Sequence, residues 1–118
     1  MLEITNPADG SRIREIDSDN EKTIKEKYTL ARTALPSWVA VPLRSRLEVI
    51  DKFKKAVEQK KGELARTLTS ETGKPITQSR NELNALAARL DFFLEKTKAA
   101  LAPEAVLNEP KMREEITH

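Results

Sequence analysis

Apolar residues recur at intervals of three and four through most of this 118-residue chain, a period that predicts amphipathic helices rather than strands. The first helix is expected to begin near residues 17–20, where Ser18 and Glu21 have the spacing of a capping box. We expect Pro36 to end it, because proline cannot continue the hydrogen bonding of a helix. Trp38 then lies in the following link and is expected to fill a gap between helices. The apolar face of this helix consists of Ile24, Tyr28, Ala31 and Leu35.

Two further helices are predicted after this link. Pro42 suits the first position of a helix, and the apolar stripe that follows it is long enough for about seven turns of one helix, although Gly62 weakens it. Gly73 suits the left-handed residue that ends a helix. Pro75 prevents continuation and can open the third helix, which Pro103 ends. The second stripe is Leu43, Leu47, Ile50, Phe53, Val57, Leu64 and Leu68, and the third is Leu83, Leu86, Ala87, Leu90, Phe93, Leu94 and Leu101.

Both ends of the chain depart from the helical period. Residues 2–16 alternate apolar and polar positions around a turn cluster at 6–11, which predicts a short β hairpin. Residues 105–107 and 112–117 flank a turn at 108–110 and predict two short strands. Their charged outer face is typical of an edge or of a ribbon that reaches away from the body. The predicted fold class is therefore mainly α, with three amphipathic helices and short β hairpins.

The composition favours helices that need a further surface to pack on. Apolar residues make up 38% of the chain and charged residues 34%, against norms of roughly 45–50% and 25%. Aromatic residues are scarce, so a core would consist mostly of Leu, Ile, Val and Ala side chains. Such a composition fits a segment whose apolar faces pack against another domain.

Charge and hydropathy exclude several classes of partner. The 21 basic and 19 acidic residues give a net charge of +2. A nucleic-acid binder usually has a clustered excess of basic residues, so this balance does not favour one. If the chain did bind nucleic acid, its affinity would fall steeply with salt. Basic residues cluster on the second helix, but interleaved acids indicate a solvated face rather than a phosphate-binding surface. No apolar run reaches the roughly 20 residues that cross a bilayer, and the first residues do not form a signal peptide, so we expect a cytoplasmic protein without membrane contact. The basic cluster is Lys52, Lys54, Lys55, Lys60 and Lys61.

The residues offer no complete catalytic set. There is no cysteine, which excludes a thiolate nucleophile and disulfides within the chain, and the one histidine is His118. A Walker-type phosphate loop needs a second glycine and a Ser or Thr after its lysine, which residues 73–75 lack. Glu71 and Glu82 could form a carboxylate pair, but nothing in the sequence fixes their separation. We therefore predict no active site within these residues.

Four short segments, in this order, resemble the N-terminal part of the aldehyde dehydrogenase superfamily. Residues 6–10 resemble its "NPATGE" turn, and residues 31–38 resemble the "AR.AFPAW" end of its first helix. Residues 68–75 resemble the "LETGKP" junction, and residues 91–93 resemble the "LRYYAG" stretch. The resemblance extends from about residue 4 to residue 118. It implies that residues 1–103 are the N-terminal helical part of the cofactor-binding domain of such an enzyme, and that residues 104–118 begin its oligomerisation arm.

The resemblance also implies a chemistry that these residues do not contain. Members of the family oxidise aldehydes to carboxylic acids with NAD or NADP, using a cysteine thiolate and a glutamate that activates water. Both residues would lie beyond His118, so we expect an N-terminal fragment of an NAD(P)-dependent aldehyde dehydrogenase that is inactive and binds no cofactor alone. Glu82 is the nearest match to a carboxylate that contributes to a monovalent-cation site in some members.

Two interpretations of the chain remain open. As an enzyme fragment, it would expose apolar stripes and associate into a homo-oligomer through the third helix or the terminal strands, and an aldehyde would bind only to the full-length protein. The alternative is a stand-alone helical interaction or oligomerisation module without catalysis. A reading frame that continues past the codon for His118 to a later cysteine would support the fragment, and a natural stop would support the module. The sequence does not choose the aldehyde, nor NAD over NADP.

Overall fold

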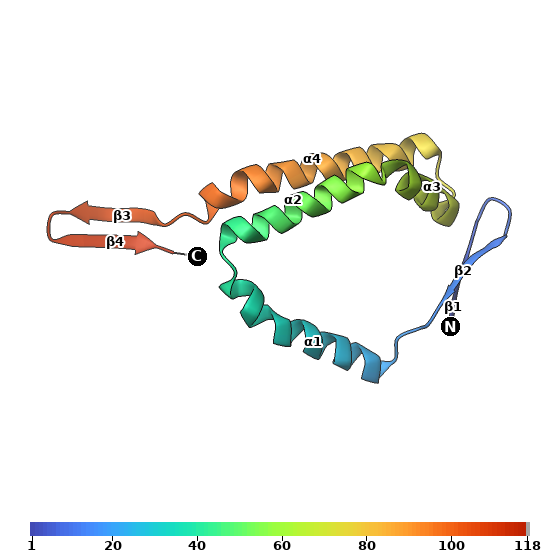
Figure 1. Cartoon of the computed structure of the whole chain (residues 1–118), viewed down its shortest axis with the longest axis horizontal. Coiled ribbons are helices and arrows are strands. Elements are labelled where there is room, and N and C mark those ends of the chain that lie inside the picture. Colours follow the sequence, from blue (N-terminus) through green and yellow to red (C-terminus); the bar gives the residue numbers. More distant parts are fainter. Residues whose placement is uncertain (118) are drawn as a thin grey trace.

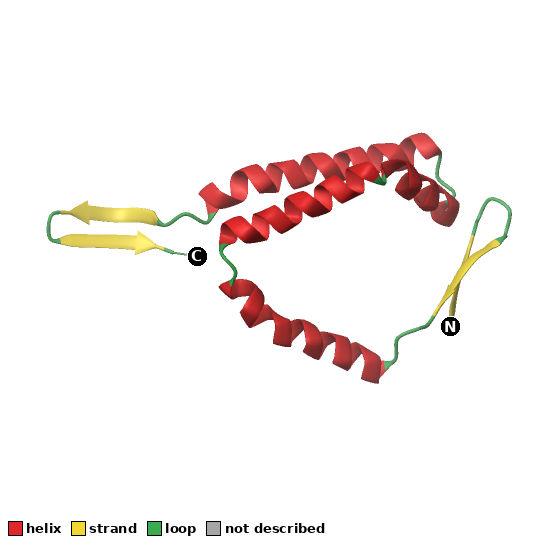
Figure 2. Ribbon diagram, in the orientation of Figure 1, coloured by secondary structure: helices red, strands yellow, loops and turns green. Residues whose placement is uncertain are grey.

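The structure is a computed structural model that describes residues 1–117; His118 lies outside the described residues. Within residues 1–117 there are four helices and two separate antiparallel hairpins, which lie near opposite ends of the longest axis (Figure 1, Figure 2). The predicted class, mainly α with short β hairpins, is confirmed. In chain order the elements are β1 Leu2–Thr5, β2 Arg12–Ile16, α1 Glu21–Ala40, α2 Leu43–Gln59, α3 Lys61–Thr72, α4 Ile76–Ala100, β3 Glu104–Glu109 and β4 Met112–Ile116.

The start of α1 is fixed by a different capping box from the predicted one. The Thr23 backbone N–H donates to Asn20 Oδ1 at 3.1 Å, and the Asn20 backbone N–H donates to Thr23 Oγ1 at 2.9 Å. Asn20 has the extended backbone of an N-cap residue and directly precedes Glu21. The prediction that Ser18 and Glu21 form the box was therefore wrong, because the helix begins two residues later than that pair requires.

The end of α1 also differs from the prediction. Pro36 lies inside the helix, which continues to Ala40. A proline so close to the C-terminus removes one hydrogen bond from a helix that is already formed upstream. The effective stop is Pro42, because a proline disfavours helical backbone in the residue before it, and Val41 is extended with φ −68° and ψ 130°. Trp38 is consequently part of α1 and 40% exposed, so the prediction that it plugs a gap between helices was wrong for the described residues.

The long second helix of the prediction is two helices. Lys60 joins α2 to α3 with φ −97° and ψ 7°, outside the helical region, and α3 leaves the direction of α2 (Figure 1). Helical bonding continues on both sides of the joint, since the Lys60 N–H donates to the Ala56 carbonyl and the Leu64 N–H to the Lys60 carbonyl. The low helix propensity of Gly62 weakens the first turn after the joint. The count of three helices is therefore corrected to four.

Helices α2, α3 and α4 form the packed part of the molecule. Helix α4 runs antiparallel to α2 and also packs on α3 (Figure 1). The Lys54 ammonium on α2 pairs with the Asp91 carboxylate on α4, and the Lys61 ammonium donates to the Asn84 amide oxygen. Among the described residues, only Ala65 of α3 and Ser79 of α4 are buried. Both are small, so α3 and α4 approach closely where these residues lie.

The chain as a whole is extended. Its radius of gyration is 21.1 Å, with extents of 72 × 39 × 20 Å, whereas a compact domain of this length has a radius of about 14 Å. Helix α1 makes at most marginal contact with the other described elements, and the β3–β4 hairpin projects from the end of α4 (Figure 1). These residues therefore do not enclose a core of their own.

Candidate functional site

The two sequence segments that define the chain most clearly, Asn6–Gly10 and Glu71–Pro75, touch in the structure. Gly73 caps α3 with φ +72°, and a Cβ added to it would lie 2.8 Å from Pro7 Cγ. That is closer than real Cβ contacts, so the proline ring rests on the glycine backbone. We call these two segments together the hairpin–helix junction. The sequence predicted Gly73 as a helix end, which is confirmed, but no local signal predicted its contact with Pro7.

The hairpin side of this junction is a closed network of hydrogen bonds. The Asn6 N–H donates to the Ser11 carbonyl at 2.8 Å, and the Gly10 N–H donates to the Asn6 carbonyl at 2.8 Å. The Asn6 side-chain oxygen accepts from the Ala8 N–H at 3.0 Å. Asp9 Oδ1 accepts from both the hydroxyl of Ser11, at 2.6 Å, and its N–H, at 2.9 Å. These bonds, led by the one from the hydroxyl, hold the pKa of Asp9 below its ordinary value and keep the turn in one shape.

The helix side of the junction is held by backbone bonds and one ion pair. The Gly73 N–H donates to the Thr69 carbonyl at 2.9 Å, and the Pro75 carbonyl accepts from the third and fourth N–H groups of α4 at 2.9 and 3.2 Å. Pro75 is the N-cap of α4, so the prediction that it opens the third helix holds to within one residue. Lys74 Nζ lies 2.5 Å from Glu82 Oε1. The junction is therefore a rigid helix stop and helix start.

A hollow of about 370 Å³ lies between the hairpin turn and the helices, and its polar groups are largely bonded within the chain. The Thr69 and Ser79 hydroxyl oxygens are 2.8 Å apart, and the Ser70 hydroxyl donates to the Thr67 carbonyl at 2.8 Å. Among the described residues, no base is hydrogen-bonded to any of these three hydroxyls, so none of them is placed as an activated nucleophile. The lining residues are Asn6, Ala8, Arg66, Thr69, Ser70, Gly73 and Ile76.

The two carboxylates that the sequence singled out, Glu71 and Glu82, do not belong to a group of side chains that could hold a metal ion. The Glu82 carboxylate pairs with Lys74 rather than with Glu71. Within residues 1–117 no group of three or more His, Cys, Asp or Glu side chains could hold a metal ion. The residues present therefore offer a monovalent cation one carboxylate, which an ammonium group already engages. Glu82 as a cation ligand stays a prediction, and His118 lies outside the described residues.

The basic cluster on α2 and α3 is tied into the helix packing. Lys54 pairs with both Asp91 and Glu58, and its hydrogen bond to Asp91 raises the pKa of Lys54. Lys55 Nζ lies 2.6 Å from Asp51 Oδ2. These pairings do not favour a phosphate-binding surface, but the solvated-face interpretation does not hold for Lys54, whose side chain is 17% exposed and paired with α4.

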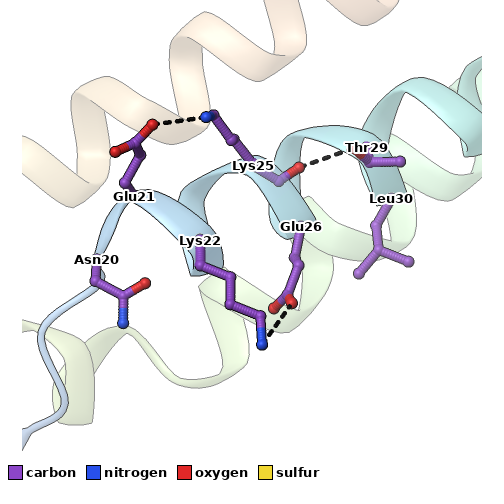
Figure 3. A pocket seen from close by; sticks show the side chains of 7 residues that line it. All are labelled: Asn20, Glu21, Lys22, Lys25, Glu26, Thr29 and Leu30. Carbon is purple, nitrogen blue, oxygen red and sulfur yellow. Dashed lines mark hydrogen bonds and ion pairs between the residues drawn. The ribbon is translucent and has the colours of Figure 1, made fainter.

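A hollow of about 950 Å³ lies open along one side of α1 (Figure 3). Its charges are paired along the helix: Lys25 Nζ lies 2.6 Å from Glu21 Oε1, and Lys22 Nζ lies 3.9 Å from Glu26 Oε1. Mixed, paired charges at this spacing are typical of a helix side that faces water. No helix among the described residues is long and apolar enough to cross a membrane. All residues that line this hollow belong to α1 or its cap: Asn20, Glu21, Lys22, Lys25, Glu26, Thr29 and Leu30.

Comparisons with known proteins identify the family to which the chain is similar. A model described as "Aldehyde dehydrogenase family" matches residues 1–118. The N-succinylglutamate 5-semialdehyde dehydrogenase of Chromobacterium violaceum is 30% identical over 90 residues, which are 76% of this chain and 18% of that protein. This chain thus spans about a fifth of the length of the curated relatives it matches.

Two solved structures share the fold. An aldehyde dehydrogenase from Brucella melitensis biovar abortus 2308 has a TM-score of 0.84 and 30% identity, over 93% of this chain and 22% of that chain. Glyceraldehyde-3-phosphate dehydrogenase GapN from Methanocaldococcus jannaschii, complexed with NADP, has a TM-score of 0.85 over 92% of this chain and 24% of that chain. Its identity of 23% supports likeness of fold alone.

Proposed function

Since the chain belongs to the aldehyde dehydrogenase family, we propose that it supplies the N-terminal helical part of an NAD(P)-dependent aldehyde dehydrogenase that oxidises an aldehyde to a carboxylic acid. Residues 1–103 would be the helical part of the cofactor-binding domain, and residues 104–118 would begin the oligomerisation arm. The observation that carries this proposal is the family match over the whole chain, although the chain is only about a fifth as long as its relatives.

The part played by these residues is structural rather than chemical. The thiolate step that the family resemblance implies needs a cysteine, and the 118 residues contain none. NAD or NADP would be held by residues outside this segment, as would the aldehyde. The chain alone is therefore expected to be inactive. Its assembly into a homo-oligomer and its cytoplasmic location remain predictions from the sequence.

The shape of the molecule supports this assignment. Large apolar side chains that a folded domain normally covers are open to solvent: Tyr28 is 65% exposed, Phe92 56% and Phe93 54%. The radius of gyration far exceeds that of a compact domain of equal length. A segment that leaves so much apolar surface uncovered needs further protein to bury it.

A chimera tests the proposal. Residues 1–118 would replace the matching segment of the Chromobacterium violaceum enzyme, and reduction of NAD or NADP by N-succinylglutamate 5-semialdehyde would be followed at 340 nm. We expect activity in the chimera and none in the 118-residue chain alone or in that enzyme with the segment deleted. Turnover by the isolated chain, or a folded chimera without turnover, would contradict the proposal.

The alternative function is a stand-alone helical interaction module. The T-shaped pair of Phe92 and Phe93, with ring centroids 5.4 Å apart, favours it because exposed aromatic pairs are typical of interaction surfaces. Genomic sequence beyond the codon for His118 separates the two functions. A continuing frame that encodes a later cysteine supports the enzyme, whereas a stop codon followed by an unrelated gene supports the module.

A further inference from the structure

The turn that joins β1 to β2 (Figure 1) contains an aspartate followed directly by a glycine, Asp9–Gly10. It is the one Asp-Gly or Asn-Gly pair in the 118 residues, since the other two glycines follow Lys61 and Thr72. Such pairs isomerise spontaneously, because glycine has no side chain to hinder attack by its backbone nitrogen on the carboxyl carbon of the preceding residue. Asp9 and Gly10 are both exposed, so the water that the reaction needs can reach them.

The isomerisation has two steps, and neither needs an oxidant or a reductant. In the first step the Gly10 nitrogen attacks Asp9 Cγ and forms an N–C bond. The amide proton and the carboxyl hydroxyl group leave together as water, and a succinimide ring remains. In the second step water adds to one of the two ring carbonyls and opens the ring. Opening at Cγ restores aspartate, whereas opening at the backbone carbonyl gives isoaspartate, in which the main chain runs through Cβ and Cγ.

Hydrogen bonds in the turn oppose the first step at both reacting groups. The Gly10 N–H donates to the Asn6 carbonyl at 2.8 Å, so the nitrogen is held away from attack with its proton in place. Asp9 Oδ1 accepts from the Ser11 hydroxyl at 2.6 Å and from the Ser11 N–H at 2.9 Å, which draw the carboxyl group toward Ser11. These bonds, led by the one from the hydroxyl, lower the pKa of Asp9, so the neutral acid that can lose its hydroxyl group is scarce at neutral pH.

We propose that Asp9–Gly10 is a latent isoaspartate site and that the hydrogen bonds of the Asn6–Ser11 turn suppress its isomerisation. Isoaspartate lengthens the main chain by one methylene group between the Asn6 carbonyl and the Gly10 N–H, which breaks the bond between them. The same turn seats Pro7 on Gly73, so isomerisation at one residue would loosen the hairpin–helix junction. This protection is a property of the turn and does not depend on the proposed function.

The first test compares folded and unfolded forms of the chimera described above. Samples are kept at neutral pH with or without guanidinium chloride and digested with trypsin, which releases a peptide that ends at Arg12. Endoproteinase Asp-N then cleaves before aspartate but not before isoaspartate, so the uncleaved fraction measures isoaspartate at residue 9. We expect isoaspartate to form at least about tenfold more slowly in the folded protein, because hydrogen bonds at both reacting groups must open first. Equal rates would overturn the proposal.

Two substitutions at Ser11 separate the hydroxyl bond from a general loosening of the turn. Ser11→Ala removes the hydroxyl that donates to Asp9 and keeps the backbone N–H, whereas the matched control Ser11→Thr keeps a hydroxyl. Each rate in the folded protein is divided by the rate of the same variant in guanidinium chloride, which removes the intrinsic effect of the new side chain. We expect this ratio to rise at least about fivefold in Ser11→Ala and to stay within about twofold in Ser11→Thr. Equal ratios in the two variants would contradict the role of the hydroxyl.

The measurement reads one peptide and needs no aldehyde oxidation. A folded chimera that oxidises no aldehyde contradicts the proposed function and leaves the isoaspartate test intact. An active chimera that forms isoaspartate at the unfolded rate upholds that function and refutes the protection. If Ser11→Ala does not fold, the unaltered chimera with and without guanidinium chloride still decides the outcome.

Discussion

Replacement of Gly73 by alanine is the sharpest test of the hairpin–helix junction. The residue has φ +72°, and an added Cβ would lie 2.8 Å from Pro7 Cγ and 3.6 Å from Pro7 Cβ. Two separate penalties therefore act on the variant: the left-handed backbone, and a collision with a stiff proline ring in another segment.

The free-energy cost of each penalty can be estimated separately. Left-handed backbone costs a non-glycine residue roughly 1–2 kcal/mol. Overpacking against a neighbour that has to move costs about 1–3 kcal/mol. We therefore expect Gly73→Ala to lower the free energy of unfolding by about 2–5 kcal/mol, which is a large share of the stability of any small domain.

Two other glycines act as matched controls. Gly10 has the same φ of +72° with nothing within 4 Å of an added Cβ, so Gly10→Ala should show the backbone penalty alone. Gly62 is helical, and its added Cβ meets only Arg66 at 3.8 Å, so Gly62→Ala should stabilise by about 0.5–1 kcal/mol. In a Pro7→Ala background the Cγ atom is gone, and the cost of Gly73→Ala should fall toward that of Gly10→Ala.

The assay is urea unfolding of the chimera that carries these residues, followed by circular dichroism at 222 nm. The reasoning is refuted if Gly73→Ala costs no more than Gly10→Ala. It is equally refuted if the cost is unchanged when Pro7 is alanine.

Three further predictions concern other parts of the chain. Ala65→Leu should lower the free energy of unfolding by about 1–3 kcal/mol in the same urea assay, because Ala65 is fully buried. The control Ala88→Leu, at an exposed position of α4, should change it by no more than about 0.5 kcal/mol. Equal costs would contradict the close approach of α3 and α4. Asp9 titrates below its ordinary pKa of 3.8, so its support of the turn is complete above that pH and is lost as the pH falls through the lowered pKa; an NMR titration of the Asp9 carboxyl that gives 3.8 or higher would contradict this. If Glu82 binds a monovalent cation in the assembled enzyme, potassium should raise the Tm of the chimera and Glu82→Gln should abolish that rise, whereas an unchanged potassium effect in the variant would exclude it.

The sequence predicted the helical segments well because their apolar period is local information. The face of Ile24, Tyr28, Ala31 and Leu35 does lie within one helix, and Gly73 does end α3 in left-handed backbone. The errors occurred where a tertiary or neighbouring effect outweighs a local rule. Pro36 is tolerated because one lost hydrogen bond near the end of a long helix is a small cost, and the stop falls to Pro42 through its effect on Val41.

Two features could not be predicted from the sequence because they depend on contacts between distant segments: the division of the second helix at Lys60, and the contact between the hairpin turn and Gly73. Helix α3 can turn away at Lys60 because Ala65 and Ser79 let it approach α4 closely, and that benefit depends on two residues from different helices. The contact of Pro7 with Gly73 likewise joins segments that no period connects. The sequence explained Gly73 fully as a helix end, and it gave no reason to single out Ala65 or Ser79, so neither contact could be predicted from local patterns.

The fold and the family of this chain are evident, whereas its described residues form no catalytic site. Under the proposed function this chain lies at the outside of a larger domain, which would explain why its apolar positions exceed what its own contacts bury. Exposed large apolar side chains lie on α1, on the Phe92 and Phe93 side of α4 and also on α2, where Phe53 is 52% and Val49 48% exposed. A free-standing helical module would turn its apolar stripes toward one core, which these helices do not do within the described residues. The exposed apolar residues of α1 therefore favour the proposed packing against further protein over a self-contained helical module.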